Sequence, residues 1–87
     1  MQNVDSEIRA RLTALVRDIL AQNSVTATVS PDTLLVDIGL TSMDMVNLML
    51  GVEAEFDFTI PQEQITPENF QSVQTLERLV AEQLQAA

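Results

Sequence analysis

Three segments of this chain carry apolar residues at the spacing of an α-helix, and the chain has only 87 residues in which to pack them. The first segment covers residues 4–21, the second covers residues 41–56, and the third covers residues 73–85, with Ser72 placed to cap the third. A chain of this length buries only about 60–65% of the surface that it exposes when unfolded. We therefore expect one all-α domain, residues 1–87, with a single modest core.

Each predicted helix has an apolar stripe that we expect to face this core, because residues three and four apart share one face of a helix. The stripes are Val4, Ile8, Leu12, Leu15 and Ile19 in the first helix, Met45, Leu48, Met49, Val52 and Phe56 in the second, and Val73, Leu76, Val80 and Leu84 in the third.

The middle helix has a second apolar stripe on its opposite side. It is formed by Met43, Val46, Leu50 and Ala54 and is flanked by Asp44, Asn47 and Glu53. A domain this small can bury only one side of a helix, so we expect the second stripe to be exposed. An exposed apolar stripe with polar flanks is typical of a surface that binds a partner. The alternative is a central helix that buries both stripes and uses its methionines to fill the core.

The connection between the first two helices, residues 21–40, is long for a compact domain. Loops beyond about 12–15 residues without structure of their own are uncommon and usually functional. Apolar and polar residues alternate at residues 25–30 as in a strand, but a lone strand has no partner, so we expect an extended loop. Four apolar residues are expected to pin the loop to the bundle, namely Leu34, Leu35, Ile38 and Leu40. A short helical turn, capped by Thr66, is expected at residues 67–70.

Composition excludes several classes of function. The chain lacks Cys, His and Lys, so it has no thiolate nucleophile, no imidazole base or metal ligand, and no Schiff-base amine. The net charge of −9 argues against binding to nucleic acid. No apolar run approaches the roughly 20 residues of a membrane span, and residues 1–5 lack the features of a signal peptide. We expect a cytoplasmic, monomeric, non-enzymatic protein with no metal and no membrane or nucleic-acid partner.

The charges are unevenly distributed along the chain. All four cations are arginines near the two ends, at positions 9, 11, 17 and 78, and the segment from Asp18 to Glu77 contains acids without a single base. One interpretation is a solvated acidic surface that favours solubility. The other is a surface that basic partner proteins recognise through electrostatic steering.

The long loop ends in a segment that could carry chemistry. Gly39 permits a tight turn, and Ser42 follows at the start of the middle helix, where free backbone N–H groups favour an anion. Ser42 has two interpretations: it caps the helix, or its hydroxyl carries a phosphoryl group. Ser42 is not a hydrolase nucleophile, because the chain has no His or Lys to accept its proton.

Three segments resemble the acyl carrier and peptidyl (aminoacyl) carrier protein family. The run Pro31–Val46, which includes Gly39-Leu40-Thr41-Ser42-Met43, resembles the attachment segment of that family. Residues 53–61 resemble the end of the family's second helix, and residues 65–73 resemble its third helix and the start of its fourth. The resemblance covers nearly the whole chain in order and spacing.

The resemblance implies a four-helix bundle of the acyl-carrier type, with three longer helices, one short helix and a long first loop. It implies that a phosphopantetheinyl transferase attaches a 4′-phosphopantetheine arm from coenzyme A to Ser42, beside Gly39, Leu40 and Thr41. The thiol of the arm then holds an acyl or aminoacyl group as a thioester, which fits a chain without a thiol of its own. The resemblance also implies that the transferase and the adenylating ligases or synthase enzymes dock on the second helix, at Met43, Asp44, Val46, Asn47, Leu50, Glu53 and Ala54.

Two features depart from the family pattern. Thr41 stands where the family commonly has Asp, and Asn47 and Ala54 occupy positions that are often acidic in fatty-acid carriers. We therefore predict a recognition face that is more apolar than that of a fatty-acid carrier and whose binding is less sensitive to salt. We also favour an amino acid, loaded by an adenylating ligase, as the cargo. The alternative function is an unmodified acidic helical adaptor for a basic partner, which gives no reason for the segment around Ser42.

Overall fold

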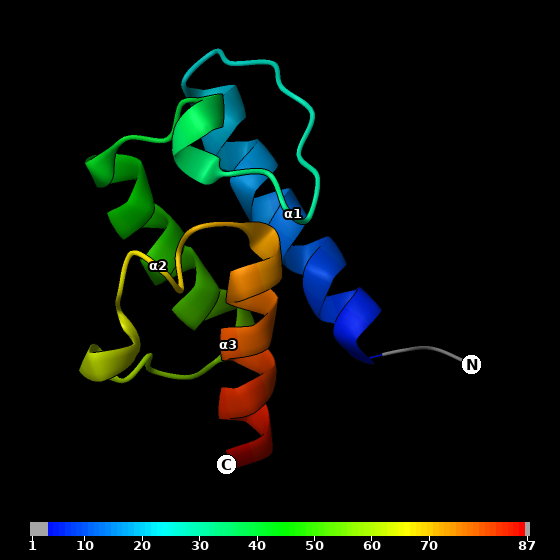
Figure 1. Ribbon diagram of the computed structural model, residues 1–87, viewed down its shortest axis with the longest axis vertical. Helices are drawn as coiled ribbons and strands as arrows, with labels where there is room; N and C mark the ends of the chain where they lie inside the picture. The colour runs from blue at the N-terminus through cyan, green and yellow to red at the C-terminus, as the bar shows by residue number, and fades with distance from the viewer. Residues whose placement is uncertain (1–3, 87) are drawn as a thin grey trace.

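The computed structural model describes residues 4–86, and this part of the chain contains three α-helices and no strand (Figure 1). The helices are α1 (Val4–Gln22), α2 (Ser42–Phe56) and α3 (Val73–Ala86), and two short 3-10 helices, η1 (Leu35–Ile38) and η2 (Gln62–Gln64), lie in the connections. The prediction of an all-α domain is confirmed for these residues. None of the helices within 4–86 is long and apolar enough to cross a bilayer.

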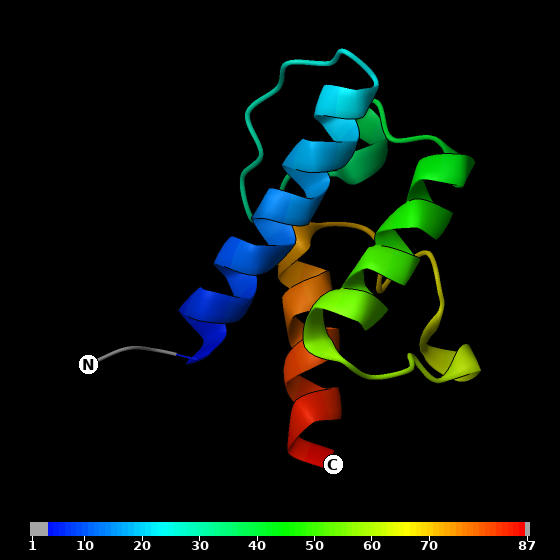
Figure 2. The ribbon, with the colours of Figure 1, turned by 180° about the vertical axis from the view of Figure 1, so that it is seen from behind.

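The three helices pack around one core. In Figures 1 and 2, α1 ascends and both α2 and α3 descend, so α1 runs opposite to its two neighbours. Helix α1 contacts both α2 and α3. It comes close to α2 at Gly51, where an added Cβ would lie 3.4 Å from Cδ2 of Leu15. At the C-terminal end of α2, Arg11 forms an ion pair of 2.7 Å with Glu55 and lies over the ring of Phe56.

The two apolar stripes of α2 have different environments, as predicted. Leu48 and Val52 are fully buried, and the two methionines of the same stripe are half-buried. On the opposite side, Met43, Val46 and Leu50 keep 72%, 50% and 53% of their surface exposed. The alternative of a central helix that buries both stripes is therefore wrong.

The core stripes of the other two helices are largely confirmed. Ile8, Leu12 and Ile19 are buried, whereas the side chain of Val4 lies outside the described residues. Leu84 is exposed, contrary to the prediction. It lies in the last turn of α3, where the helix extends past its neighbours (Figure 1).

The long connection is an extended loop tied to α3 and to the segment before it. In the loop, the N–H of Leu35 donates to Gln71 O at 2.9 Å, and Pro31 O accepts from the N–H of Gln74 at 2.8 Å. Leu35 is fully buried, as predicted. Leu34 is exposed, so the prediction that it pins the loop to the bundle is wrong.

The segment before α3 forms one turn at residues 67–70, as predicted from the sequence. Thr66 caps it as predicted, because its Oγ1 accepts from the N–H of Asn69 at 3.2 Å. The N–H of Phe70 donates to Thr66 O at 3.2 Å, and residues 71 and 72 then lead directly into α3. Ser72 is confirmed as the cap of α3, because its Oγ accepts from the N–H of Thr75 at 3.3 Å.

Candidate functional site

The chain reverses direction at Gly39, just before α2. Gly39 has a φ of 107°, in the left-handed region that favours glycine, and its N–H donates to carbonyl oxygens of η1. Leu40 is buried, and its N–H donates to Leu35 O at 3.2 Å. Gly39 therefore turns the chain, and Leu40 anchors it to the core immediately before Thr41.

Helix α2 is capped by Thr41 and not by Ser42. The Oγ1 of Thr41 accepts from the N–H of Asp44 at 3.2 Å, and Oδ2 of Asp44 accepts from the N–H of Thr41 at 2.9 Å. These reciprocal bonds form a capping box. The interpretation of Ser42 as the cap is therefore wrong, because Ser42 is the first residue within the helix.

Asp44 is buried, with 7% of its surface exposed, although we expected it on the exposed flank of the second stripe. Its Oδ2 also accepts from Nδ2 of Asn23, at 2.9 Å, just beyond the end of α1. The hydrogen bond from the backbone of Thr41, followed by that from the side chain of Asn23, lowers the pKa of Asp44 below its ordinary value, although burial opposes this shift. Asp44 is therefore an ionised capping residue that faces inward.

Ser42 is exposed at the start of α2, and among the described residues its hydroxyl has no hydrogen-bond partner. The capping box uses the N–H groups of Thr41 and Asp44, which leaves those of Ser42 and Met43 as the free donors of the first turn. Together with the helix dipole, these two donors favour a negative charge beside the hydroxyl.

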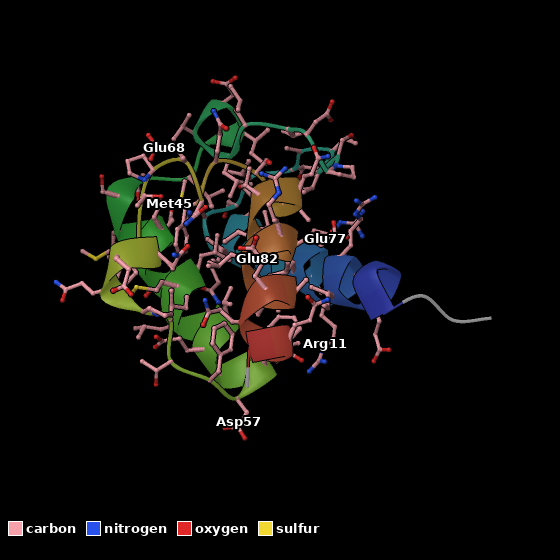
Figure 3. The ribbon with its side chains drawn as sticks, turned by 60° about the horizontal axis from the view of Figure 1, so that its bottom comes forward. Arg11, Met45, Asp57, Glu68, Glu77 and Glu82 are labelled. Atoms are coloured by element: carbon pink, nitrogen blue, oxygen red, sulfur yellow. The ribbon has the colours of Figure 1, made fainter. Side chains whose placement is uncertain are left out.

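An apolar groove of about 530 Å³ begins at Ser42. It lies between α2, the 3-10 helix η1 and the segment at residues 65–71, and Figure 3 labels Met45 on α2 and Glu68 on the segment that faces it. The side chains that line the groove are Leu34, Val36, Ser42, Met45, Val46, Met49, Ile65, Thr66, Pro67, Phe70 and Gln71. Sequence reasoning did not assign the members outside α2 to this site, because only the fold brings them beside Ser42.

The predicted partner face is partly as expected. Met43, Val46, Asn47, Leu50 and Ala54 are exposed on one side of α2.

Glu53 was expected on the flank of the exposed stripe. Its Oε2 instead accepts from the N–H of Ile60 at 2.8 Å, which closes the loop after α2. Asp44 is buried and Glu55 is paired with Arg11, so all the carboxylates of α2 make contacts within the domain. The exposed side of this helix therefore carries four apolar residues and Asn47.

Comparison with known proteins identifies the family. The sequence pattern of the family described as "Phosphopantetheine attachment site" matches residues 10–82. This chain belongs to the phosphopantetheine-bearing carrier proteins. The family holds its cargo on a covalently attached phosphopantetheine, so the prosthetic group that the resemblance implied is confirmed at the level of the family. The residues at the start of α2 fit this group, because they offer an exposed hydroxyl, two free N–H donors and an adjoining apolar groove.

Relatives of the carrier family were found by sequence and by structure. The chain is 67% identical to "Aminoacyl carrier protein 1" of Bradyrhizobium diazoefficiens over 87 residues, which is 100% of this chain and 97% of the relative.

Two solved structures contain carrier chains with the same fold. The first is a Bradyrhizobium japonicum glycine:[carrier protein] ligase complexed with its cognate carrier protein and an analogue of glycyl adenylate. It matches with a TM-score of 0.75 and 69% identity, over 86% of this chain and 97% of that one. The second is the same type of ligase complexed with glycylated carrier protein, with a TM-score of 0.73 and 71% identity, over 83% and 97% of the two chains.

Proposed function

We propose that this chain is an aminoacyl carrier protein whose arm is attached to Ser42. In loading, the Ser42 hydroxyl oxygen bonds to the pantetheine-bearing phosphorus of coenzyme A. The bond from that phosphorus to the nucleotide breaks, adenosine 3′,5′-bisphosphate leaves, and the hydroxyl proton passes to the transferase. When bound, the arm supplies the thiol that holds the amino acid as a thioester.

The residues of this chain give Ser42 three properties that suit this role. The capping box of Thr41 and Asp44 holds the first turn of α2 without using the Ser42 hydroxyl. The free N–H groups of residues 42 and 43 favour the charge of a phosphodiester. The groove beside Ser42 offers apolar surface next to the attachment point.

The observation that carries the choice of cargo is the 71% identity to a carrier chain solved in its glycylated form. We propose glycine, activated as an adenylate by a ligase, as the cargo of this chain. The unmodified adaptor is disfavoured, because the family match spans residues 10–82 and includes the whole attachment segment.

We further propose that the ligase docks on the exposed side of α2, at Met43, Val46 and Leu50, with Asn47 and Ala54 beside them. Residues 1–87 would act as one monomeric carrier domain of the cytoplasm with no reaction of its own. The turn at residues 66–70 would be the counterpart of the family's short helix, which would complete the four-helix bundle.

The test is a two-step charging experiment followed by intact mass. The purified chain is first loaded with coenzyme A and a phosphopantetheinyl transferase, then incubated with glycine, ATP and the Bradyrhizobium ligase. We expect the chain to gain the mass of the arm in the first step and the mass of one glycyl group in the second. Hydroxylamine should then remove the glycyl group. If the arm is added but no glycine follows, while the ligase charges its own carrier normally, the aminoacyl proposal is wrong.

A further inference from the structure

The end of α1 has a fixed conformation that aims Asn23 at the start of α2. The N–H of Val25 donates to Leu20 O at 2.8 Å, and the N–H of Ser24 donates to Ala21 O at 3.1 Å. Ser24 has a φ of 58°, so α1 ends in a Schellman motif with a non-glycine residue in the left-handed position. Asn23 lies within this turn, directly before Ser24, and its N–H donates to Leu20 O at 3.1 Å, so the motif sets its backbone.

The side chain of Asn23 reaches the carboxylate that caps α2. Nδ2 of Asn23 lies 2.9 Å from Oδ2 of Asp44, and the same oxygen accepts from the N–H of Thr41 at 2.9 Å. Thr41 and Asp44 flank Ser42 on its two sides. One carboxylate oxygen therefore joins the end of α1 to both sides of the attachment residue.

We propose that Asn23 is a positioning residue for the loading of Ser42, because it holds Asp44, and with it the first turn of α2, in the orientation that a transferase recognises. The inference rests on the proposed attachment at Ser42.

The capping box and the Asn23 bond have different roles. The capping box is local and keeps the first turn helical, whatever direction that turn takes relative to the bundle. The Asn23 bond joins this turn to α1, and among the described residues the other polar side-chain contact between the two helices, Arg11 with Glu55, lies at the opposite end of α2. Loss of the Asn23 bond would leave the partners of the capping box in place, but Asp44 would hold the N–H of Thr41 less firmly. This would lower the fraction of molecules with Ser42 correctly placed.

This role predicts a specific kinetic change. A transferase that binds only the correctly placed form has its apparent affinity reduced by the fraction of molecules in that form. If Asn23→Ala reduces the fraction of molecules with Ser42 correctly placed to between about a third and a tenth, the KM of the transferase for this chain should rise by roughly three- to tenfold. The kcat should stay unchanged, since the bound form is the same.

The experiment compares Asn23→Ala with Gln22→Ala, which removes the exposed amide next to it in sequence. Transfer of the arm from coenzyme A is followed by intact mass over a range of carrier concentrations. Amide hydrogen exchange is measured at Thr41, next to the bond, and at Val52 in the core. We expect Asn23→Ala to raise the KM and to speed exchange at Thr41 but not at Val52, and Gln22→Ala to change neither. An unchanged KM for Asn23→Ala would overturn the inference.

A double-mutant cycle tests whether Asn23 acts through Asp44. Asn23→Ala should have no further effect on KM in an Asp44→Ala background, because the acceptor is already gone. An equal effect in both backgrounds would mean that Asn23 contacts the transferase directly, and the positioning role would be wrong. If the chain with its native sequence did not accept the arm at all, that result would instead contradict the attachment at Ser42.

Discussion

Thr41 and Asp44 exchange two hydrogen bonds across Ser42, at 2.9 Å and 3.2 Å, and neither bond uses the Ser42 hydroxyl. The residue that we propose to be modified is thus held by its neighbours while its oxygen stays accessible. Thr41 stands where the family commonly has Asp. It can make the capping bond without adding a second negative charge beside the attachment point.

The cap gives a first prediction. Thr41→Val keeps the size of the side chain but removes the oxygen that accepts from Asp44, so it should lower the free energy of unfolding by about 1 kcal/mol. Thr41→Asp restores an acceptor at the cap and should stay close to the native stability. Urea denaturation of both variants measures the difference. Equal losses in the two would show that the capping bond contributes little.

The two sides of α2 give a second prediction. Leu50→Glu changes a half-exposed residue and should alter the free energy of unfolding by less than about 0.5 kcal/mol, while charging by the ligase falls sharply. Leu48→Ala, two residues away, empties a fully buried position and should cost about 2–5 kcal/mol. Urea denaturation and the glycine charging assay separate the two effects. Unfolding of Leu50→Glu would contradict the exposed stripe.

The contacts of the α2 carboxylates give a third prediction, which concerns salt. Since Asp44, Glu53 and Glu55 all bond within the domain, the docking side of α2 offers apolar contacts and few charges. Raising the ionic strength from about 0.05 M to about 0.5 M should change the ligase's KM for the loaded chain by less than about threefold. A steep rise in KM over that range would show that recognition depends on ion pairs.

The pKa of Asp44 gives a fourth prediction. Hydrogen bonds lower this pKa below its ordinary value of 3.8, so the unfolded chain binds the proton more readily than the folded one. The stabilisation from Asp44 should be complete above about pH 5 and lost as the pH falls through the lowered pKa.

Urea unfolding from pH 6 to pH 2.5 should therefore show a shallower loss of stability for Asp44→Asn than for the native chain. Asp37→Asn, which changes an exposed carboxylate on η1, serves as the matched control. A slope for Asp44→Asn equal to that of the native chain would contradict the lowered pKa.

Much of this fold could be predicted from periodicity. Apolar spacing identified the start and end of α2 and its buried residues Leu48 and Val52, because a helix of this length must bury one side. It also identified the exposed stripe that contains Leu50. The spacing of Leu84 was equally regular, but periodicity does not show where neighbouring helices end, so its exposure was missed.

The polar contacts could not be predicted in the same way. Asp44 and Glu53 were expected on the flanks of the exposed stripe, because their positions on the helix face away from the core stripe. Their actual partners, Asn23 and the N–H of Ile60, come from segments that only the packed loops bring near. The apolar groove was missed for the same reason, because residues such as Ile65 reach Ser42 only in the folded chain.

The most direct test of the account is the intact mass of the native chain and of Ser42→Ala after incubation with coenzyme A and a phosphopantetheinyl transferase. Because Thr41 caps α2, Ser42→Ala should stay folded, which its circular dichroism and urea denaturation would verify. We predict that the native chain gains the mass of one phosphopantetheine group and that the variant gains none. An equal gain by the folded variant would place the arm on another residue, and no gain by the native chain would contradict the carrier function itself.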